Sequence, residues 1–259
     1  MNKIYKVFLL TILALSVGSC TDKFKEIDDL CVNTFNLVLS SPASTKVTLN
    51  NPLSLSASDR LWKWEEGDIP SVILNQGGKE IVIPVASCVL DVDEPSIMKV
   101  NVGEIPSGSV LKGASFGTES AFGKSCDGYE DIPSSMVYAR ATFSSIGSAM
   151  ALPDLTLKHQ CSYIYIVPDF VGEFQMTSYT IEGKGLKGGT DMHTIRLSFK
   201  DSEGEDYIPK WVAVSNSSTD ITIKVSAGGN EYVMAELANA GKGRCCLYYV
   251  RNKTIGVEY

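Results

Sequence analysis

The first residues to consider belong to a serine-centred motif. Gly113-Ala114-Ser115-Phe116-Gly117 matches the G-x-S-x-G pattern, in which a sharp strand-to-helix turn exposes a nucleophilic serine. His159 and His193 follow the motif in the order that a hydrolase would use. The motif requires a helix after the serine, whereas more glycines follow here and the surrounding pattern is that of strands. We therefore expect no serine hydrolase, and we expect no catalytic residue of another kind.

Two groups of residues carry side chains that metal ions favour. His159 and Cys161 stand two positions apart and would share one face of a strand, but two ligands do not complete a zinc site. Asp91, Asp93 and Glu94 could hold calcium, but the twelve-residue calcium loop is absent. A half-buried strand and a solvated turn explain these residues better. We expect neither a metal nor a cofactor.

The tryptophans offer a third kind of site, a stacking platform for sugar rings. Trp62 and Trp64 share a face if residues 61–64 form a strand, and Trp211 is the third tryptophan. Packing in the core is the competing interpretation, because large aromatic side chains supply much of the buried area of a β-sandwich. The sequence leaves both alternatives open.

Cys20 is the residue whose chemistry is most clearly indicated. Lys3 and Lys6 precede an apolar run at 7–15, and the small residues 16–19 separate that run from Cys20. This is the order of a secretory signal, and the run is shorter than the ~20 apolar residues that span a bilayer. Val17-Gly18-Ser19-Cys20 also resembles the lipobox of bacterial lipoproteins, in which the cysteine is acylated.

The first part of the chain therefore divides into a signal and an anchor. We predict that residues 1–19 form a lipoprotein signal peptide and that residues 20–31 form a lipidated tether, which is charged and poor in core residues. Lipid on Cys20 would attach the protein stably to a membrane, because two or more acyl chains make a stable anchor. The alternative is an ordinary signal peptide with Cys20 as a free thiol.

Charge and cysteine content limit the partners. The chain has 23 Lys and Arg residues against 30 Asp and Glu residues, and removal of the signal would make it more acidic still. An acidic chain without a basic run is a poor ligand for nucleic acid. Cys31, Cys88, Cys126, Cys161, Cys245 and Cys246 follow Cys20, and the sequence does not decide which of them are paired. Adjacent Cys245 and Cys246 would point to opposite faces of a strand.

A two-residue period dominates the chain after residue 31. Within 193–200, Ile195, Leu197 and Phe199 alternate with polar residues, and 219–226 repeats the arrangement. Such alternation is typical of half-buried strands. We find no convincing helical period, so the chain is predicted to be all-β.

Other local patterns place turns and boundaries. Gly77-Gly78, Gly188-Gly189 and Gly228-Gly229 are expected at the tips of hairpins or loops. The apolar phase changes near Thr177-Ser178, which predicts a bulge, and 163–167 reads as a strand buried on both faces.

A long loop is expected at 117–133. We place the domain boundary near residue 150, which gives an N-terminal β-sandwich at 32–150 and a C-terminal β-sandwich at 151–259.

A succession of short motifs runs along the mature chain. The first three are Phe35-Asn36-Leu37-Val38-Leu39, Thr45-Lys46-Val47-Thr48-Leu49 and Trp62-Lys63-Trp64-Glu65-Glu66-Gly67-Asp68-Ile69. Others follow at 98–106, 113–116, 131–136, 155–159, 207–214 and in the closing strands up to Tyr259. Together these motifs resemble the fimbrillin-like lipoproteins of the Bacteroidales, the subunits of type V pili. The resemblance covers most of the mature chain.

The resemblance implies two tandem transthyretin-like β-sandwich domains and assembly by exchange of β-strands. In this family a trypsin-like protease trims the N-terminal strand after a basic residue, which opens a groove for a strand of the next subunit. Lys46 and Arg60 are the candidate cut sites, unless they are ordinary surface residues. Ile255, Val257 and Tyr259 alternate with other residues at the end of the chain, which could donate a strand or complete its own sheet.

Two functions from different classes follow from this reading. The first is a structural, non-enzymatic subunit or accessory anchor or tip component of a fimbrium. Its expected partners are other pilin subunits or copies of itself, the outer membrane through the lipid on Cys20, and a host or bacterial surface ligand. The second is a surface glycan-binding lipoprotein of a polysaccharide-uptake system, with the tryptophans as its platforms.

Overall fold

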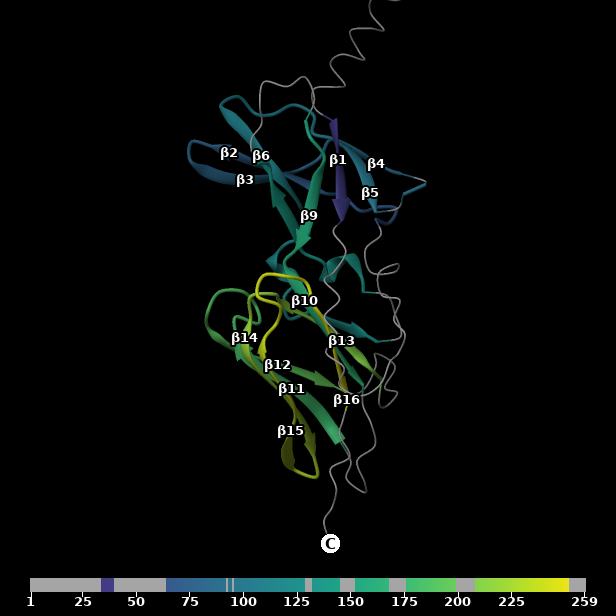
Figure 1. The fold of residues 1–259 in the computed structure, drawn as a ribbon, viewed down its shortest axis with the longest axis vertical. Coiled ribbons are helices and arrows are strands. Elements are labelled where there is room, and N and C mark those ends of the chain that lie inside the picture. The colour runs from purple at the N-terminus through teal and green to yellow at the C-terminus, as the bar shows by residue number, and fades with distance from the viewer. Residues whose placement is uncertain are drawn as a thin grey trace, which may run out of the picture.

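The computed structural model describes most of the chain between residues 34 and 251. The described residues are 34–39, 64–91, 93–94, 96–128, 132–144, 152–167, 176–198 and 208–251. Within these ranges the chain forms strands and two short 3-10 helices, without an α-helix (Figure 1). The all-β prediction is thus confirmed, and the transthyretin-like topology stays a prediction. No helix in the described ranges is long and apolar enough to cross a membrane.

The strands and 3-10 helices follow one another along the whole described chain. Their bounds are β1 Thr34–Leu39, β2 Ser71–Gln76, β3 Lys79–Pro84, β4 Ser87–Leu90, β5 Ile97–Asn101, β6 Ser109–Phe116, η1 Glu119–Ala121, β7 Ser125–Asp127, η2 Ser134–Met136, β8 Ala139–Thr142, β9 Leu155–His159, β10 Cys161–Val167, β11 Met176–Lys184, β12 Met192–Ser198, β13 Lys210–Ser215, β14 Thr219–Ala227, β15 Asn230–Asn239 and β16 Leu247–Arg251.

Eight strands form the first sheet, in the upper half of Figure 1, in the order β3-β2-β6-β8-β9-β1-β5-β4. Its neighbouring strands are antiparallel except for β1 and β9, which run parallel. Leu74 of β2 and Met98 of β5, from opposite ends of the sheet, are buried in the same hydrophobic core. The sheet therefore folds over and encloses a core between its two halves.

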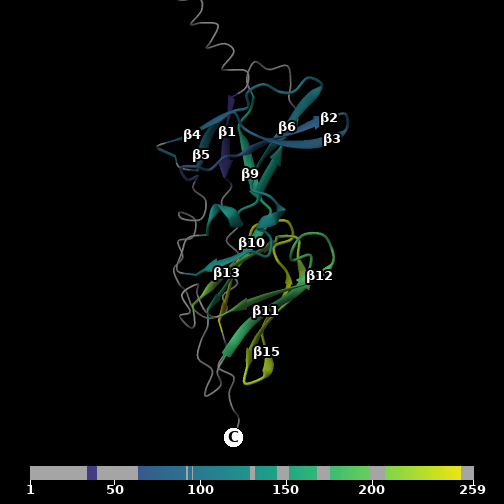
Figure 2. The same cartoon turned by 180° about the vertical axis from the view of Figure 1, so that it is seen from behind.

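Two four-stranded sheets form the lower half of the molecule, as both views show (Figures 1 and 2). Their orders are β16-β10-β13-β7 and β12-β11-β14-β15. Ile164 of β10 and Ile181 of β11 meet in a second core between these sheets. Tyr163 and Trp211 point from the other face of the first of these sheets into the core of the upper half. This shared sheet is therefore buried on both faces, as predicted for 163–167.

Two strands connect the upper and lower halves. β7 lies between β6 and β8 in the sequence, yet it pairs with β13 of the lower half. β9 follows residue 150, yet it pairs with β8 and β1 of the upper half. Where β9 gives way to β10, Gln160 N donates to Tyr138 O at 2.7 Å. The division into domains near residue 150 stays a prediction, and hydrogen bonds tie segments from both sides of that position together.

Several local predictions are confirmed at the level of hydrogen bonds. The pairing of β11 with β14 shifts register between Met176 and Ser178, at the expected bulge. Gly77 and Gly78 have φ angles of 59° and 83° and reverse the chain between β2 and β3, where glycine avoids the strain of positive φ. The segment at 117–133 differs from the expected loop, because it contains η1 and the three-residue strand β7.

Candidate functional site

The N-terminal strand β1 lies inside the first sheet rather than at its edge. It pairs antiparallel with β5, from Thr34 opposite Asn101 to Val38 opposite Ile97. On its other side it pairs parallel with β9, where Leu37 lies opposite Leu155. Figure 1 shows β1 in purple between β9 and β5. A short segment from the start of the described chain therefore completes the middle of a sheet.

The side chains of β1 alternate between the core and a half-buried face. Phe35, Leu37 and Leu39 are 4%, 0% and 7% exposed and belong to the core of the upper half. The Phe35 ring meets the Phe143 ring edge to face, with centroids 5.4 Å apart. Full burial of one large apolar side chain contributes about 1.5–3 kcal/mol, so the three together contribute roughly 5–9 kcal/mol.

Hydrogen bonds also fix the register of β1. Leu39 N donates to Ser96 O at 3.1 Å, and Asn36 N donates to a carboxylate oxygen of Asp154 at 3.3 Å. The indole Nε1 of Trp64 donates to Leu37 O at 3.3 Å. Removal of β1 would leave these partners exposed, together with the facing edges of β5 and β9. Unpaired strand edges of this kind are templates for another strand.

The predicted processing and lipid sites lie beside this strand in the sequence. Cys20, Lys46 and Arg60 lie outside the described residues, as do Ile255, Val257 and Tyr259. The described strand β1 ends at Leu39, and the described chain resumes at residue 64. A cut after Lys46 or Arg60 would therefore break the covalent link between β1 and the rest of the described structure.

The serine-centred motif forms an ordinary strand, as we expected when we rejected a hydrolase. Ser115 lies in β6, and the three-residue 3-10 helix η1 follows the strand in place of the α-helix that the motif requires. Both glycines of the motif permit close approach of the neighbouring backbone. A Cβ at Gly113 would lie 2.0 Å from Ala141 O of β8, and a Cβ at Gly117 would lie 1.9 Å from Val137 O, two residues before β8. Tight strand packing thus accounts for the spacing.

The two candidate metal ligands belong to different sheets. His159 ends β9 and Cys161 begins β10, so the expectation that they share a strand face was wrong. Burial lowers the pKa of His159 to about 3, and the imidazole is neutral near pH 7. No cluster of three or more potential metal ligands occurs among the residues that the structure describes.

The acidic group around Asp91 is a turn. The Asp91 carboxylate accepts hydrogen bonds from Asp93 N at 2.9 Å and from Glu94 N at 3.0 Å. This arrangement is typical of an aspartate that stabilises a turn in its own backbone.

Two of the tryptophans are buried rather than exposed as platforms. Trp64 is 3% exposed and packs edge to face against Phe116, with ring centroids 5.0 Å apart. Trp211 is 4% exposed, with its ring centroid 4.4 Å from that of Tyr165. Trp62 lies outside the described residues. For Trp64 and Trp211 the core interpretation is therefore correct, and a sugar platform built on them is excluded.

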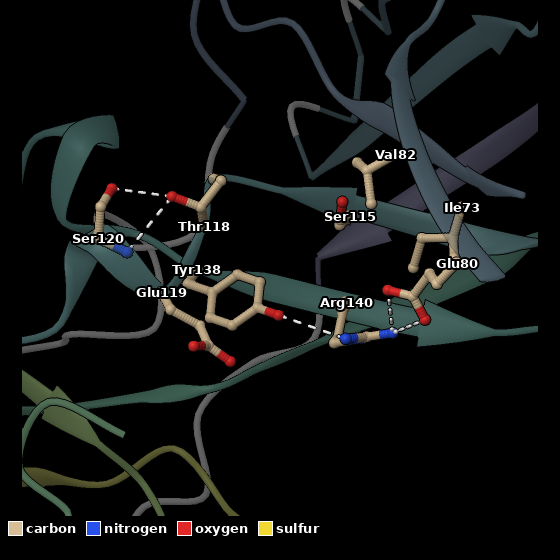
Figure 3. Close-up of a pocket in the computed structure, with 10 residues that line it drawn as sticks. Ile73, Glu80, Val82, Ser115, Thr118, Glu119, Ser120, Tyr138 and Arg140 are labelled. Atoms are coloured by element: carbon tan, nitrogen blue, oxygen red, sulfur yellow. Dashed lines mark hydrogen bonds and ion pairs between the residues drawn. The ribbon is translucent and has the colours of Figure 1, made fainter. Parts of the chain in front are cut away.

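A pocket of about 380 Å³ lies on the outer face of the first sheet, against η1 (Figure 3). Ile73 and Val82 supply apolar surface, and hydroxyl groups come from Ser115 and Tyr138. Residues Gly117, Thr118, Glu119 and Ser120 form the wall nearest η1. The pocket thus combines a small apolar surface with several hydrogen-bonding groups.

Arg140 and Glu80 form the charged side of this pocket. Arg140 Nη2 donates to both oxygens of the Glu80 carboxylate, at 3.2 and 3.0 Å, and Arg140 Nη1 donates to Tyr138 Oη at 3.4 Å. Partial burial disfavours the guanidinium charge, but these hydrogen bonds outweigh it and raise the pKa of Arg140 above its ordinary value. The sequence did not predict this contact, because 60 positions separate the two residues.

Comparison with known proteins gives matches of fold only. No protein-family profile matches this chain, and no curated protein matches it. Among solved structures, a candidate adhesin from Bacteroides ovatus is similar at 10% identity and a TM-score of 0.37, covering 89% of this chain and 95% of that one.

Two further solved structures show the same kind of similarity. A second candidate adhesin from Bacteroides ovatus matches at 6% identity and a TM-score of 0.43, covering 85% of this chain and 88% of the other. The tip fimbrial protein Mfa3 from Porphyromonas gingivalis matches at 9% identity and a TM-score of 0.32, with 78% of this chain and 81% of that chain covered. At these values we draw no functional conclusion from the matches.

Proposed function

We propose that this chain is a structural component of a surface fimbrium, either a subunit or an accessory anchor or tip component, which assembles by strand exchange and supports adhesion. The observation that carries the proposal is the position of β1. It is an interior strand with three buried side chains, and Lys46 and Arg60 lie in the sequence between it and residue 64, where the described chain resumes. A single cut after either residue would convert β1 into a replaceable strand.

Replacement of β1 is physically reasonable because its pairing is mostly generic. Backbone hydrogen bonds to β5 and β9 would accept any extended segment, while the spaces left by alternate side chains would select its sequence. The roughly 5–9 kcal/mol of apolar burial lost with β1 would be available again to an incoming strand of similar side chains. Trimming alone would therefore leave a surface that favours association.

The C-terminal end has the composition of such a donor. Ile255, Val257 and Tyr259 would occupy one face of a strand, at the spacing of the three buried side chains of β1. Without β1, the groove would have a space that fits an aromatic ring where Phe35 was and a space that fits an aliphatic side chain where Leu39 was. Tyr259 meets the aromatic space if the donor runs opposite to β1, parallel to β5 and antiparallel to β9.

If Cys20 carries lipid, the same cut would also determine whether the molecule serves as an anchor or as a subunit of the polymer. An uncut chain would keep β1 and remain attached to the outer membrane as an anchoring member. A chain cut after Lys46 or Arg60 would separate from its lipid and could enter a polymer.

Limited proteolysis of the lipid-free mature chain tests the proposal. Trypsin should cut between β1 and residue 64, and size-exclusion chromatography should then show oligomers that appear as a ladder on gels. The triple variant Lys46→Gln, Arg60→Gln, Lys63→Gln, which removes every trypsin site between β1 and residue 64, should stay monomeric. The control Lys112→Gln, on an exposed position of β6, should behave like the parent chain. A peptide of residues 252–259 should cap the trimmed protein, and the same peptide with Val257→Asp should not.

The proposal fails if the trimmed chain loses β1 and still remains monomeric at high concentration. It also fails if oligomers form equally well from the triple variant, since strand exchange would then not require the cut.

A second candidate function, glycan binding, is favoured by the pocket beside η1. Its hydroxyl groups and the Arg140–Glu80 pair present both donors and acceptors, next to the apolar surface of Ile73 and Val82. Such a mixture suits one unit of a neutral saccharide. Affinity electrophoresis against a glycan panel tests this function: retardation by a glycan that Arg140→Ala abolishes would support it, and no retardation by any glycan would refute it.

A further inference from the structure

Two cysteines lie side by side in the sheet that both cores share. Cys161 begins β10, and Cys245 lies two residues before β16, which pairs parallel with β10. Cys161 is 0% exposed and Cys245 is 7% exposed, and both belong to the core of the upper half. Both are thiols in the structure. Their shared burial raises the question whether they react with each other.

The register of the two strands places the cysteines opposite one another. Tyr163 pairs with Leu247, so two residues back along each parallel chain brings Cys161 level with Cys245. The chains stay adjacent there, because Tyr163 N donates to Cys246 O at 2.9 Å. Neighbouring strands lie about 4.8 Å apart, within the Cα separation of about 4.4–6.8 Å that disulfides require.

We propose that Cys161 and Cys245 are joined by a disulfide bond in the exported protein. The idea rests on export, which is part of the proposed function, but it does not depend on strand exchange. The in vitro test of the disulfide therefore gives a result that is independent of the fimbrial proposal.

The other described cysteines are excluded as partners by their positions. Cys246 points to the opposite face of the sheet, into the second core. Cys126 lies on β7, and β13 separates β7 from β10, so the two strands are about 9.6 Å apart. Cys88 lies on β4, at the far edge of the first sheet. Among the described residues, Cys245 is thus the partner within reach of Cys161.

The reaction is a thiol–disulfide exchange with an oxidant that carries a disulfide, such as a thiol–disulfide oxidoreductase or oxidised glutathione. One cysteine thiolate attacks the oxidant, forms a mixed disulfide and releases one thiol of the oxidant. The second cysteine then attacks the sulfur of the first and releases the other thiol. The pair loses two electrons and two protons, and the oxidant gains them as two thiols.

Burial determines when this exchange can take place. Burial raises the pKa of the Cys161 thiol to about 11 and raises the pKa of the Cys245 thiol well above its ordinary value. Little thiolate is present in the folded protein near pH 7, and the thiolate is the attacking species. The bond should therefore form while the chain is still unfolded, and it should resist reductants after folding.

The bond would fix the last described strand to the body of the protein. Among the described strands, β16 pairs with β10 alone and lies at the edge of its sheet. A disulfide from Cys245 to Cys161 would prevent β16 from leaving that edge. Force on a C-terminal donor segment that is bound to a neighbouring subunit would then not detach β16 from its own subunit.

Oxidative refolding of the mature chain without its lipid-bearing Cys20, residues 21–259, tests the bond. Refolding in a glutathione redox buffer should lower the intact mass by about 2 Da, the two hydrogens removed. A proteolytic digest should then contain one linked pair of peptides, carrying Cys161 and Cys245. The disulfide closes a segment of roughly 80 residues, so oxidation should raise the melting temperature by roughly 5–15 °C.

Variants and a folding control sharpen the result. Cys161→Ser should leave Cys245 open to alkylation after denaturation and should remove the rise in melting temperature. The control Cys88→Ser should keep the Cys161–Cys245 bond and the rise in melting temperature. Protein that was folded in a reductant should react slowly with oxidised glutathione until it is unfolded. The proposal is overturned if both thiols of the refolded parent chain are alkylated, or if the digest links Cys161 to any other cysteine.

Discussion

The buried imidazole of His159 makes a quantitative prediction about acid stability. Its pKa falls from an ordinary 6.5 to about 3 in the folded chain, because burial disfavours the charged form. In the unfolded chain the side chain returns to its ordinary pKa. Between these two values the unfolded state therefore binds a proton that the folded state does not bind. By linkage, the free energy of unfolding decreases as the pH falls through this window.

The size of the effect follows from the pKa difference. Each pKa unit corresponds to about 1.4 kcal/mol, so His159 alone should cost about 2 kcal/mol between pH 7 and pH 5. For a chain of this length that corresponds to a melting temperature roughly 4–8 °C lower. Carboxylates also titrate in this range, so the contribution of His159 must be measured as a difference between variants.

His159→Gln removes the titrating group, and urea unfolding at pH 7 and pH 5 measures the outcome. We expect the variant to lose about 2 kcal/mol less than the parent chain between these pH values, whatever its stability at pH 7. His193→Asn is the matched control, because it removes the other histidine and keeps the buried one. Equal losses in the parent chain and in His159→Gln would refute the reasoning.

Three further predictions concern stability, each measured by urea unfolding. Leu37→Ala, at a fully buried position of β1, should lower the free energy of unfolding by roughly 2–5 kcal/mol, and Val38→Ala on the half-buried face should cost less. Gly117→Ala brings a Cβ to 1.9 Å from Val137 O and should cost more than Gly108→Ala, where φ is also positive and the space is open. Glu80→Gln breaks an ion pair whose side chains are 33% and 52% exposed, so it should cost less than about 1 kcal/mol, and less still at high salt.

Local features of the fold could be predicted because short-range physics determines them. The alternation of Ile195 and Leu197 predicted a strand with one buried face, which β12 has. The change of phase near Thr177-Ser178 predicted the bulge, since an extra residue reverses the faces of the strand after it. Adjacent Cys245 and Cys246, in the two residues before β16, belong to different cores, which agrees with their expected opposite directions.

Long-range pairing could not be predicted in the same way. β7 was hidden in a segment rich in glycine and serine, because a strand of three residues carries no periodic signal. His159 and Cys161 seemed to share a strand, but the chain changes sheets between them at Gln160. The motif at 35–39 resembled a strand of the fimbrillin-like family, but the sequence did not predict that its neighbours would be β5 and β9.

The connection between the two halves has a mechanical consequence. The backbone crosses between the halves at least three times: from β6 down to β7, from β7 back up to β8, and from β9 down to β10. A single crossing would act as a hinge under tension. Several crossings share the load, and β7 is hydrogen-bonded to β13 along its length. Under tension, the two halves should therefore not bend relative to each other at the connection between them, and the molecule should transmit force as a rigid body.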